Sequence, residues 1–140
     1  MTRFAVDPAD VIVGILRLAL PDVTIRASIP DGVPELVPLV VVRRTGGSSL
    51  VPEFWDQPIT NVQNWAAHDG DIDASRAASD LADQIRRALW TAWRQQTVVA
   101  AGHIAGIREF LGPMEAIDPD LPHLGRYTAT YELLVRPVAA

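Results

Sequence analysis

The longest regular pattern of apolar and polar positions runs from Asp71 to Trp93. Apolar residues recur there every three or four positions, which is the spacing of one face of an α-helix. Asp71 and Asp73 precede the apolar positions, where a carboxylate caps a helix and suits the positive end of its dipole. Asp83 and Arg87 lie four residues apart in the favourable acid-then-base order. Many of the first core-facing positions are alanine, so we predict a helix that packs closely on a β-sheet.

A second helix is predicted near the start of the chain. Asp7 provides an N-cap and Pro8 suits the first helical position, and the apolar spacing then continues to Ala19, before Pro21. Runs of β-branched and apolar residues predict strands, which we place at residues 23–29, 36–43, 60–67, 98–110 and 126–136.

Three of these strands have a more specific interpretation. The second half of 36–43 is continuously apolar, which predicts a central strand buried on both faces, with Pro38 near its start. In 60–67 one alternating set of residues opposes another that includes Trp65, which predicts a half-exposed strand. The clean alternation of 126–136 is the strongest strand signal, and because 98–110 has a similar length we predict that the two pair as an antiparallel hairpin.

The remaining segments are predicted to be loops. They are a flexible loop at 44–49, a segment at 53–58 that contains Phe54 and Trp55, and a long loop at 111–124. We therefore expect residues 1–140 to form a single α+β domain. Its mixed or antiparallel sheet is packed by two main helices, in the order α-β-β-β-α-β-β.

Composition excludes several classes of protein. With 49% hydrophobic and 21% charged residues the chain is too apolar to be disordered. The net charge of −5 and the absence of lysine disfavour a nucleic-acid-binding surface. With no cysteine, there is no disulfide framework, thiolate metal site or cysteine nucleophile.

The N-terminal region has no export or membrane signal. The first residues lack the charged and apolar regions of a signal peptide, and the apolar run at 11–20 is interrupted by Gly14 and Arg17. That run is also too short to span a bilayer. We expect a soluble protein that is made in the cytoplasm and not exported on its own.

The densest polar cluster surrounds His68, Asp69 and Asp71. Read as a calcium-binding loop that starts at Asp69, it has carboxylates at its first, third and fifth positions. It then fails, because Ala74 replaces the required glycine and Asp80 stands where the bidentate glutamate belongs. We interpret the cluster as the capped start of the long helix, with a weak cation site as the alternative.

No catalytic constellation is visible elsewhere. His68, His103 and His123 lie in three different segments without the i, i+4 pairing of a zinc-binding helix. The pair Ser48 and Ser49 follows two glycines but does not form a G-x-S-x-G nucleophile elbow. We expect no enzyme activity, no cofactor and no metal.

The tryptophans raise the question of a subunit interface. Trp90 and Trp93 fall on the flank of the long helix, off its alanine-rich face. Such residues serve either a core or an interface, where desolvated tryptophan is enriched. Phe54 and Trp55 likewise belong either to the core or to a subunit interface.

The order of several motifs resembles a known family. Those motifs are the strand and loop PLVVVRRTGG (38–47), the strand end NWA (64–66) before the helix SRAASDLADQIRRAL (75–89), IREFLGPM (107–114) and the terminal strand RYTATYELLVR (126–136). Together they resemble the tail terminator, or tail completion, proteins of long-tailed siphovirus-type phages, over roughly residues 7–136.

The resemblance implies a virion structural protein without enzymatic chemistry. It implies a small α+β subunit that forms a hexameric ring at the head-proximal end of the tail, after assembly in the host cytoplasm. The ring caps the tail tube, ends its elongation and offers its other face to head-completion or neck proteins. The partners implied are other copies of the chain, the tail tube protein and a neck protein, with genomic DNA only passing through the lumen and no membrane involved.

A cyclic ring needs two different matching patches on each subunit. The segments at 46–55 and 111–124 are the expected suppliers of contacts. The interface candidates are Phe54, Trp55, Trp90, Trp93, Pro113 and Met114.

Two alternatives remain beside the tail terminator. One is another neck or head–tail connector component of similar size. The other is a small metal- or ligand-binding domain that uses His68, Asp69 and Asp71.

Overall fold

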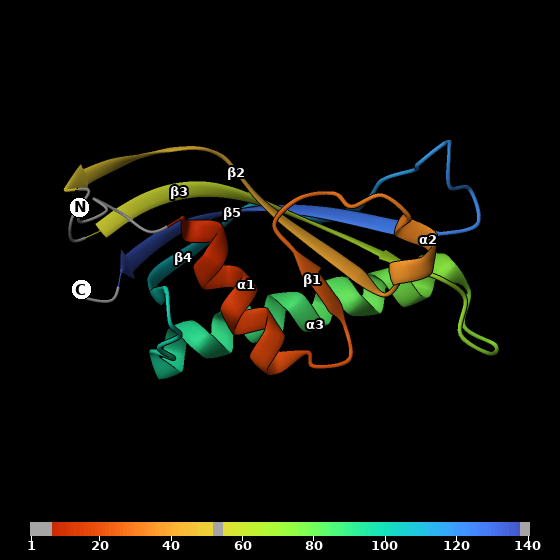
Figure 1. The fold of residues 1–140 in the computed structure, drawn as a ribbon, viewed down its shortest axis with the longest axis horizontal. Helices are drawn as coiled ribbons and strands as arrows, with labels where there is room; N and C mark the ends of the chain where they lie inside the picture. Colours follow the sequence, from red (N-terminus) through yellow and green to blue (C-terminus); the bar gives the residue numbers. More distant parts are fainter. Residues whose placement is uncertain (1–6, 52–54, 138–140) are drawn as a thin grey trace.

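The computed structural model describes residues 7–51 and 55–137. Within these residues, five strands form one sheet in the order β1-β2-β3-β5-β4 (Figure 1). Only the β1–β2 pair is parallel, and the other neighbours are antiparallel. The strands are β1 (Thr24–Arg26), β2 (Leu39–Val51), β3 (Trp55–Ala66), β4 (Gly102–Glu115) and β5 (Gly125–Pro137). The helices are α1 (Pro8–Ala19), α2 (Val33–Leu36) and α3 (Ala74–Gln95). The predicted α+β class and element order are confirmed, with α2 as an addition.

Both long helices begin at aspartate caps. The Asp7 carboxylate accepts a hydrogen bond from Ala9 N at 2.9 Å, and the Asp73 carboxylate accepts one from Arg76 N at 2.8 Å. These bonds satisfy backbone donors that the first helical turn leaves without partners. The predicted starts of both helices are therefore confirmed, although Asp71 lies outside the helix and only Asp73 caps it.

One face of the sheet is covered by α1 and α3, which lie on the same side (Figure 1). Most strand side chains that point to this side are apolar and buried, and they pack with both helices into the main core, while Asp56, Thr60 and Asn64 are buried polar exceptions. The alanine-rich start of α3 approaches β5 so closely that a Cβ on Gly125 would lie 2.0 Å from the Ala74 carbonyl oxygen. Close packing of this helix on the sheet, as predicted, is confirmed.

The opposite face is covered at one end only. There Val33 of α2 packs with Leu39, Val41 and Trp65 in a second apolar cluster. Trp65 is only 2% exposed, because α2 and the loop at 116–124 cover that end of the face. The rest of this face carries mainly amide, hydroxyl and charged side chains, with Leu111 and Met114 opposite Thr130 and Thr128 at its β4 edge, and we call it the open face.

Several predicted boundaries were wrong. Of the predicted loop at 53–58, residues 55–58 belong to β3, and β4 begins at Gly102 rather than at residue 98. Residues 44–49 belong to β2 rather than a flexible loop, because register shifts beside Gly46 absorb the extra residues while pairing with β3 continues. The first strand is only Thr24–Arg26. The segment 111–115 belongs to β4, because Pro113 lies on an edge strand inside a register shift and need not donate a ladder hydrogen bond.

Candidate interaction surfaces

The second half of β4 and the loop residue Ile117 after it carry exposed apolar side chains, which we call the β4 patch. It comprises Phe110, Leu111, Met114 and Ile117, which are 55%, 52%, 53% and 82% exposed. Edge strands usually avoid such side chains because they promote association with other chains. The predicted interface candidate Met114 belongs to this patch, and the half-buried Pro113 lies beside it.

Register shifts interrupt the edge on which this patch lies. They occur between Ile104 and Gly106, between Glu109 and Leu111, and between Leu111 and Met114. Bulges of this kind twist an edge strand and prevent another strand from pairing along it. The β4 patch is therefore shaped for contact through side chains rather than for extension of the sheet.

A groove of about 440 Å³ runs between the C-terminal parts of α1 and α3. Its wall on α1 includes Ile15 and Leu18, and its wall on α3 includes Arg87, Ala88 and Thr91. Leu18 is 68% exposed, which is unusual for a large apolar side chain on a helix that otherwise faces the core. The groove is mainly apolar and has one guanidinium group at its side.

The sequence interpretation missed the groove and most of the β4 patch. Two signals were present. Leu18 lies outside the apolar face of its helix, next to Arg17, and the adjacent pair Phe110 and Leu111 breaks the alternation of an edge strand. Neither signal shows by itself that a partner exists.

Trp90 and Trp93 are half-buried on the main core. The Trp90 ring contacts Tyr131 edge to face, with 5.9 Å between ring centroids. The Trp93 indole Nε1 donates a hydrogen bond to the Ala105 carbonyl oxygen at 3.2 Å. Much of both side chains is thus used within the subunit, and their contact with a neighbour stays a prediction.

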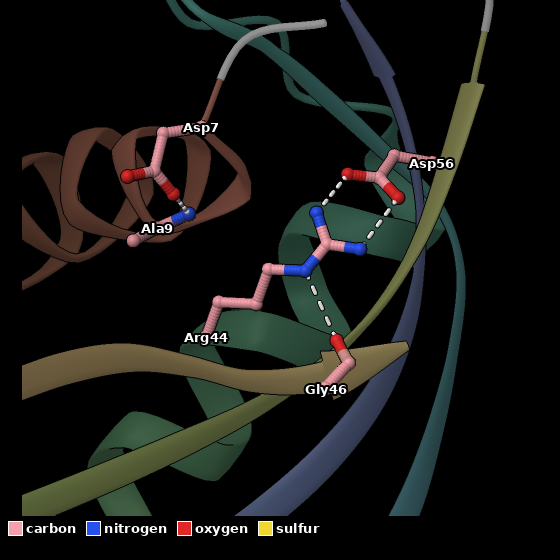
Figure 2. A network of polar contacts seen from close by, with 5 residues as sticks. All are labelled: Asp7, Ala9, Arg44, Gly46 and Asp56. Carbon is pink, nitrogen blue, oxygen red and sulfur yellow. Dashed lines mark hydrogen bonds and ion pairs between the residues drawn. The ribbon is translucent and has the colours of Figure 1, made fainter. Parts of the chain in front are cut away.

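An ion pair between Arg44 of β2 and Asp56, near the start of β3, joins these two long strands (Figure 2). Arg44 donates to both carboxylate oxygens of Asp56, at 2.6 and 3.0 Å, and its Nε donates to the Gly46 carbonyl oxygen. The Asp56 side chain is 3% exposed, whereas the Arg44 side chain is 34% exposed. The interface candidate Phe54 lies outside the described residues, and for Trp55 the structure gives backbone pairing with Val51.

A second charged group lies where α3 meets β4 and β5. Arg86 pairs with Glu109 at 2.6 Å. Burial and the nearby Glu109 raise the pKa of Tyr131 to about 12, while Arg86 acts in the opposite direction. The tyrosine therefore stays neutral at physiological pH and acts as part of the core.

The predicted polar cluster before α3 forms an exposed turn. Asp69 and Ile72 exchange backbone hydrogen bonds across it, Asp71 is exposed, and Asp73 serves as the helix cap. Among the residues that the structure describes, no three His, Cys, Asp or Glu side chains are grouped to hold a metal ion. The capping interpretation is confirmed for Asp73.

None of the helices in the described ranges is long and apolar enough to cross a membrane.

Comparison with known protein families places the chain. A family model described as phage tail termination protein matches residues 5–136, which is nearly the whole chain. No curated protein matches the sequence.

Proposed function

The chain belongs to the phage tail termination protein family, and from this membership we propose that it closes the finished tail tube as a ring. It is a structural protein of the phage tail, and its place is the virion. We propose in addition that the ring is a hexamer at the head-proximal end of the tail, that it ends tube elongation and that it catalyses no reaction.

The proposed ring has three protein contacts. Each subunit contacts further copies of itself, one face of the ring contacts the last layer of tail tube protein, and the other face contacts a head-completion or neck protein. Genomic DNA only passes through the lumen. The acidic balance, a net charge of −5, would keep DNA from adhering there.

The observation that carries the proposal is the family match over residues 5–136. The surface of the subunit supports it. A closed ring is built from one heterologous contact, which requires two different patches on every subunit. The groove between α1 and α3 and the β4 patch are two such surfaces. The six predicted interface residues stay proposals for the contacts of the ring.

The test uses purified protein and tail tubes assembled without a terminator. Light scattering over a range of concentrations gives the mass of the protein alone, and negative-stain images give its position on the tubes. The proposal expects rings, in solution or on tubes, and added density at one end of each tube. A strict monomer that leaves both tube ends bare would overturn it.

The same images separate a terminator from another connector protein. A terminator binds tubes that have never met a head. A neck connector that joins only completed tails to heads would leave these tubes unchanged and would bind after a terminator has been added.

A further inference from the structure

We propose that the groove between α1 and α3 receives the β4 patch of a second copy of this chain. The inference rests on the proposed ring, because it names the two surfaces that meet at each contact between subunits. It makes α1, α3, the end of β4 and Ile117 the assembly elements, with Leu111 and Met114 lying at the β4 edge of the open face, opposite Thr130 and Thr128.

Both surfaces gain from leaving water. The groove has an apolar lining to which Leu18 adds a largely exposed side chain, and the β4 patch has four large side chains that are each more than half exposed. Burying apolar area contributes roughly 25 cal/mol per Å². A groove of about 440 Å³ lies within the size range in which protein clefts hold partly enclosed groups.

The charges around the two surfaces are opposite. Arg87 lines the groove, and Arg94 lies one turn from the groove residue Thr91 on the exposed side of α3. The β4 patch is followed by the acids Asp118 and Asp120. Complementary charge of this kind steers two surfaces together and fixes their register.

The Arg87 guanidinium can change its partner from a carboxylate of its own subunit to one of a neighbour. In the single subunit it pairs with Asp83 at 2.9 Å, and these side chains are 79% and 51% exposed. Exposed ion pairs contribute little to stability. Little stability is therefore lost when Arg87 turns to a carboxylate of the neighbour.

One subunit cannot fill its own groove. The end of β4 lies at the start of α3, where Ser75 donates a hydrogen bond to Glu115 at 2.9 Å. Thr91 in the groove comes 16 residues after Ser75 on the same helix, which corresponds to about 24 Å along its axis. The patch must therefore enter the groove of another copy, and this contact is heterologous, as a ring requires.

Pairing of sheet edges is the competing way to join two copies. Among the described residues, β2 has no partner strand on its β1 side beyond Val41. β2 near Gly46 and β4 both contain register shifts in the pairing with their inner neighbours, and such bulges distort an edge strand. Because both edge strands are distorted, side-chain docking in the groove is favoured over a continuous sheet.

The test combines two variants that each damage one surface. Thr91→Glu places a carboxylate in the groove, and Met114→Glu places one in the patch. Both positions are exposed, so each variant should keep the fold, which circular dichroism and thermal melting verify. Ile29→Glu is the matched control, because Ile29 is 49% exposed and belongs to neither surface.

Mass measurement by light scattering then gives a distinctive result. Each variant alone should be a monomer, and Ile29→Glu should assemble as the wild type does. An equimolar mixture of the two variants should stop at two subunits, because one intact groove meets one intact patch and both remaining surfaces are damaged. Rings from either variant alone, or no dimer in the mixture, would overturn the pairing.

A disulfide cross-link tests the same pairing of groove and patch on tail tubes. It therefore also applies if the ring forms on tubes but not in solution. The chain has no cysteine, so Thr91→Cys with Met114→Cys creates a single designed pair. Oxidation should join copies into ladders of covalent multimers, whereas Ile29→Cys with Met114→Cys should give none. Equal cross-linking of both pairs would overturn the pairing.

The failure of this inference is distinguishable from the failure of the proposed function. If the wild type forms rings and both glutamate variants do too, the ring stands and the assigned surfaces are wrong. If the wild type forms no ring in solution or on tubes, the proposed function fails, and the inference fails with it.

Discussion

The two faces of the sheet are made from the same strands but are stabilised differently. On the helix-covered face, Val40, Val42 and Leu133 are almost fully buried under α1 and α3. On the open face, polar side chains satisfy one another: Asn61 Nδ2 donates to Thr128 Oγ1 at 2.8 Å. Stability thus depends on one face, and the other can change at lower cost.

The largest expected contrast is between a core residue and an open-face residue. Leu89→Ala removes a fully buried side chain of α3 and should lower the free energy of unfolding by about 3 kcal/mol. Thr130→Ala on the open face should lower it by less than about 0.5 kcal/mol. Urea unfolding of both variants measures the difference, and similar losses would remove the distinction between the faces.

Alkaline pH should weaken the covered face through Tyr131. Its pKa is raised from 10.0 to about 12 in the folded protein, so the unfolded chain loses this proton first. Stability is therefore full below pH 10 and falls as pH rises toward 12, by up to about 2.5 kcal/mol.

Tyr131→Phe is the matched variant for this effect. Its unfolding free energy, followed by urea titration at several pH values, should fall less between pH 10 and 12 than that of the wild type. Parallel curves for the two proteins would show that Tyr131 is not the titrating group.

The ion pair of Arg44 and Asp56 on the helix-covered face should contribute more to stability than an ion pair exposed to solvent. Arg44→Ala leaves the buried Asp56 carboxylate without this partner and should cost about 2 kcal/mol, below the roughly 3–5 kcal/mol of a fully buried pair. The expected loss is smaller than for a fully buried pair because part of the Arg44 side chain remains in solvent. Arg76→Ala breaks the exposed pair with Asp80 and should cost about 0.3–0.5 kcal/mol. Equal shifts in the thermal midpoint would contradict the comparison.

Two asparagines on β3 provide the smallest and closest comparison. Asn64 is buried under α3 and donates to the Ala78 carbonyl oxygen at 2.9 Å, whereas Asn61 lies on the open face. Asn64→Ala should cost about 1–2 kcal/mol and Asn61→Ala about 0.5–1 kcal/mol, because water can replace the bonds of Asn61. A larger loss for Asn61→Ala, measured in urea, would indicate that the open face is covered in the folded protein.

The helix-covered face could be predicted from sequence because its determinants are local. The aspartate caps and the apolar periodicity of α3 specify the helices, and the alternation from Tyr127 to Val135 specifies β5 and its buried side. The hairpin of β4 and β5 was predicted from the similar lengths of the two strands and is confirmed.

The rest depends on contacts between distant residues. Nothing local to Trp65 shows that Val33 and Leu121 will cover it. Likewise, residues 44–49 look like a loop until pairing with β3 is known. The groove could not be read from sequence at all, since it exists only where α1 meets α3. The family could be inferred from the order of its motifs, but not the surfaces by which its members assemble.

The most direct test of the account is the length of tail tubes that grow in the presence of the protein. Tube protein is supplied in excess to tubes of measured length, with or without the wild-type chain, and lengths are measured by electron microscopy. The account predicts that bound wild-type protein stops further growth at the end that carries it. Tubes that lengthen equally with and without the protein bound would contradict it.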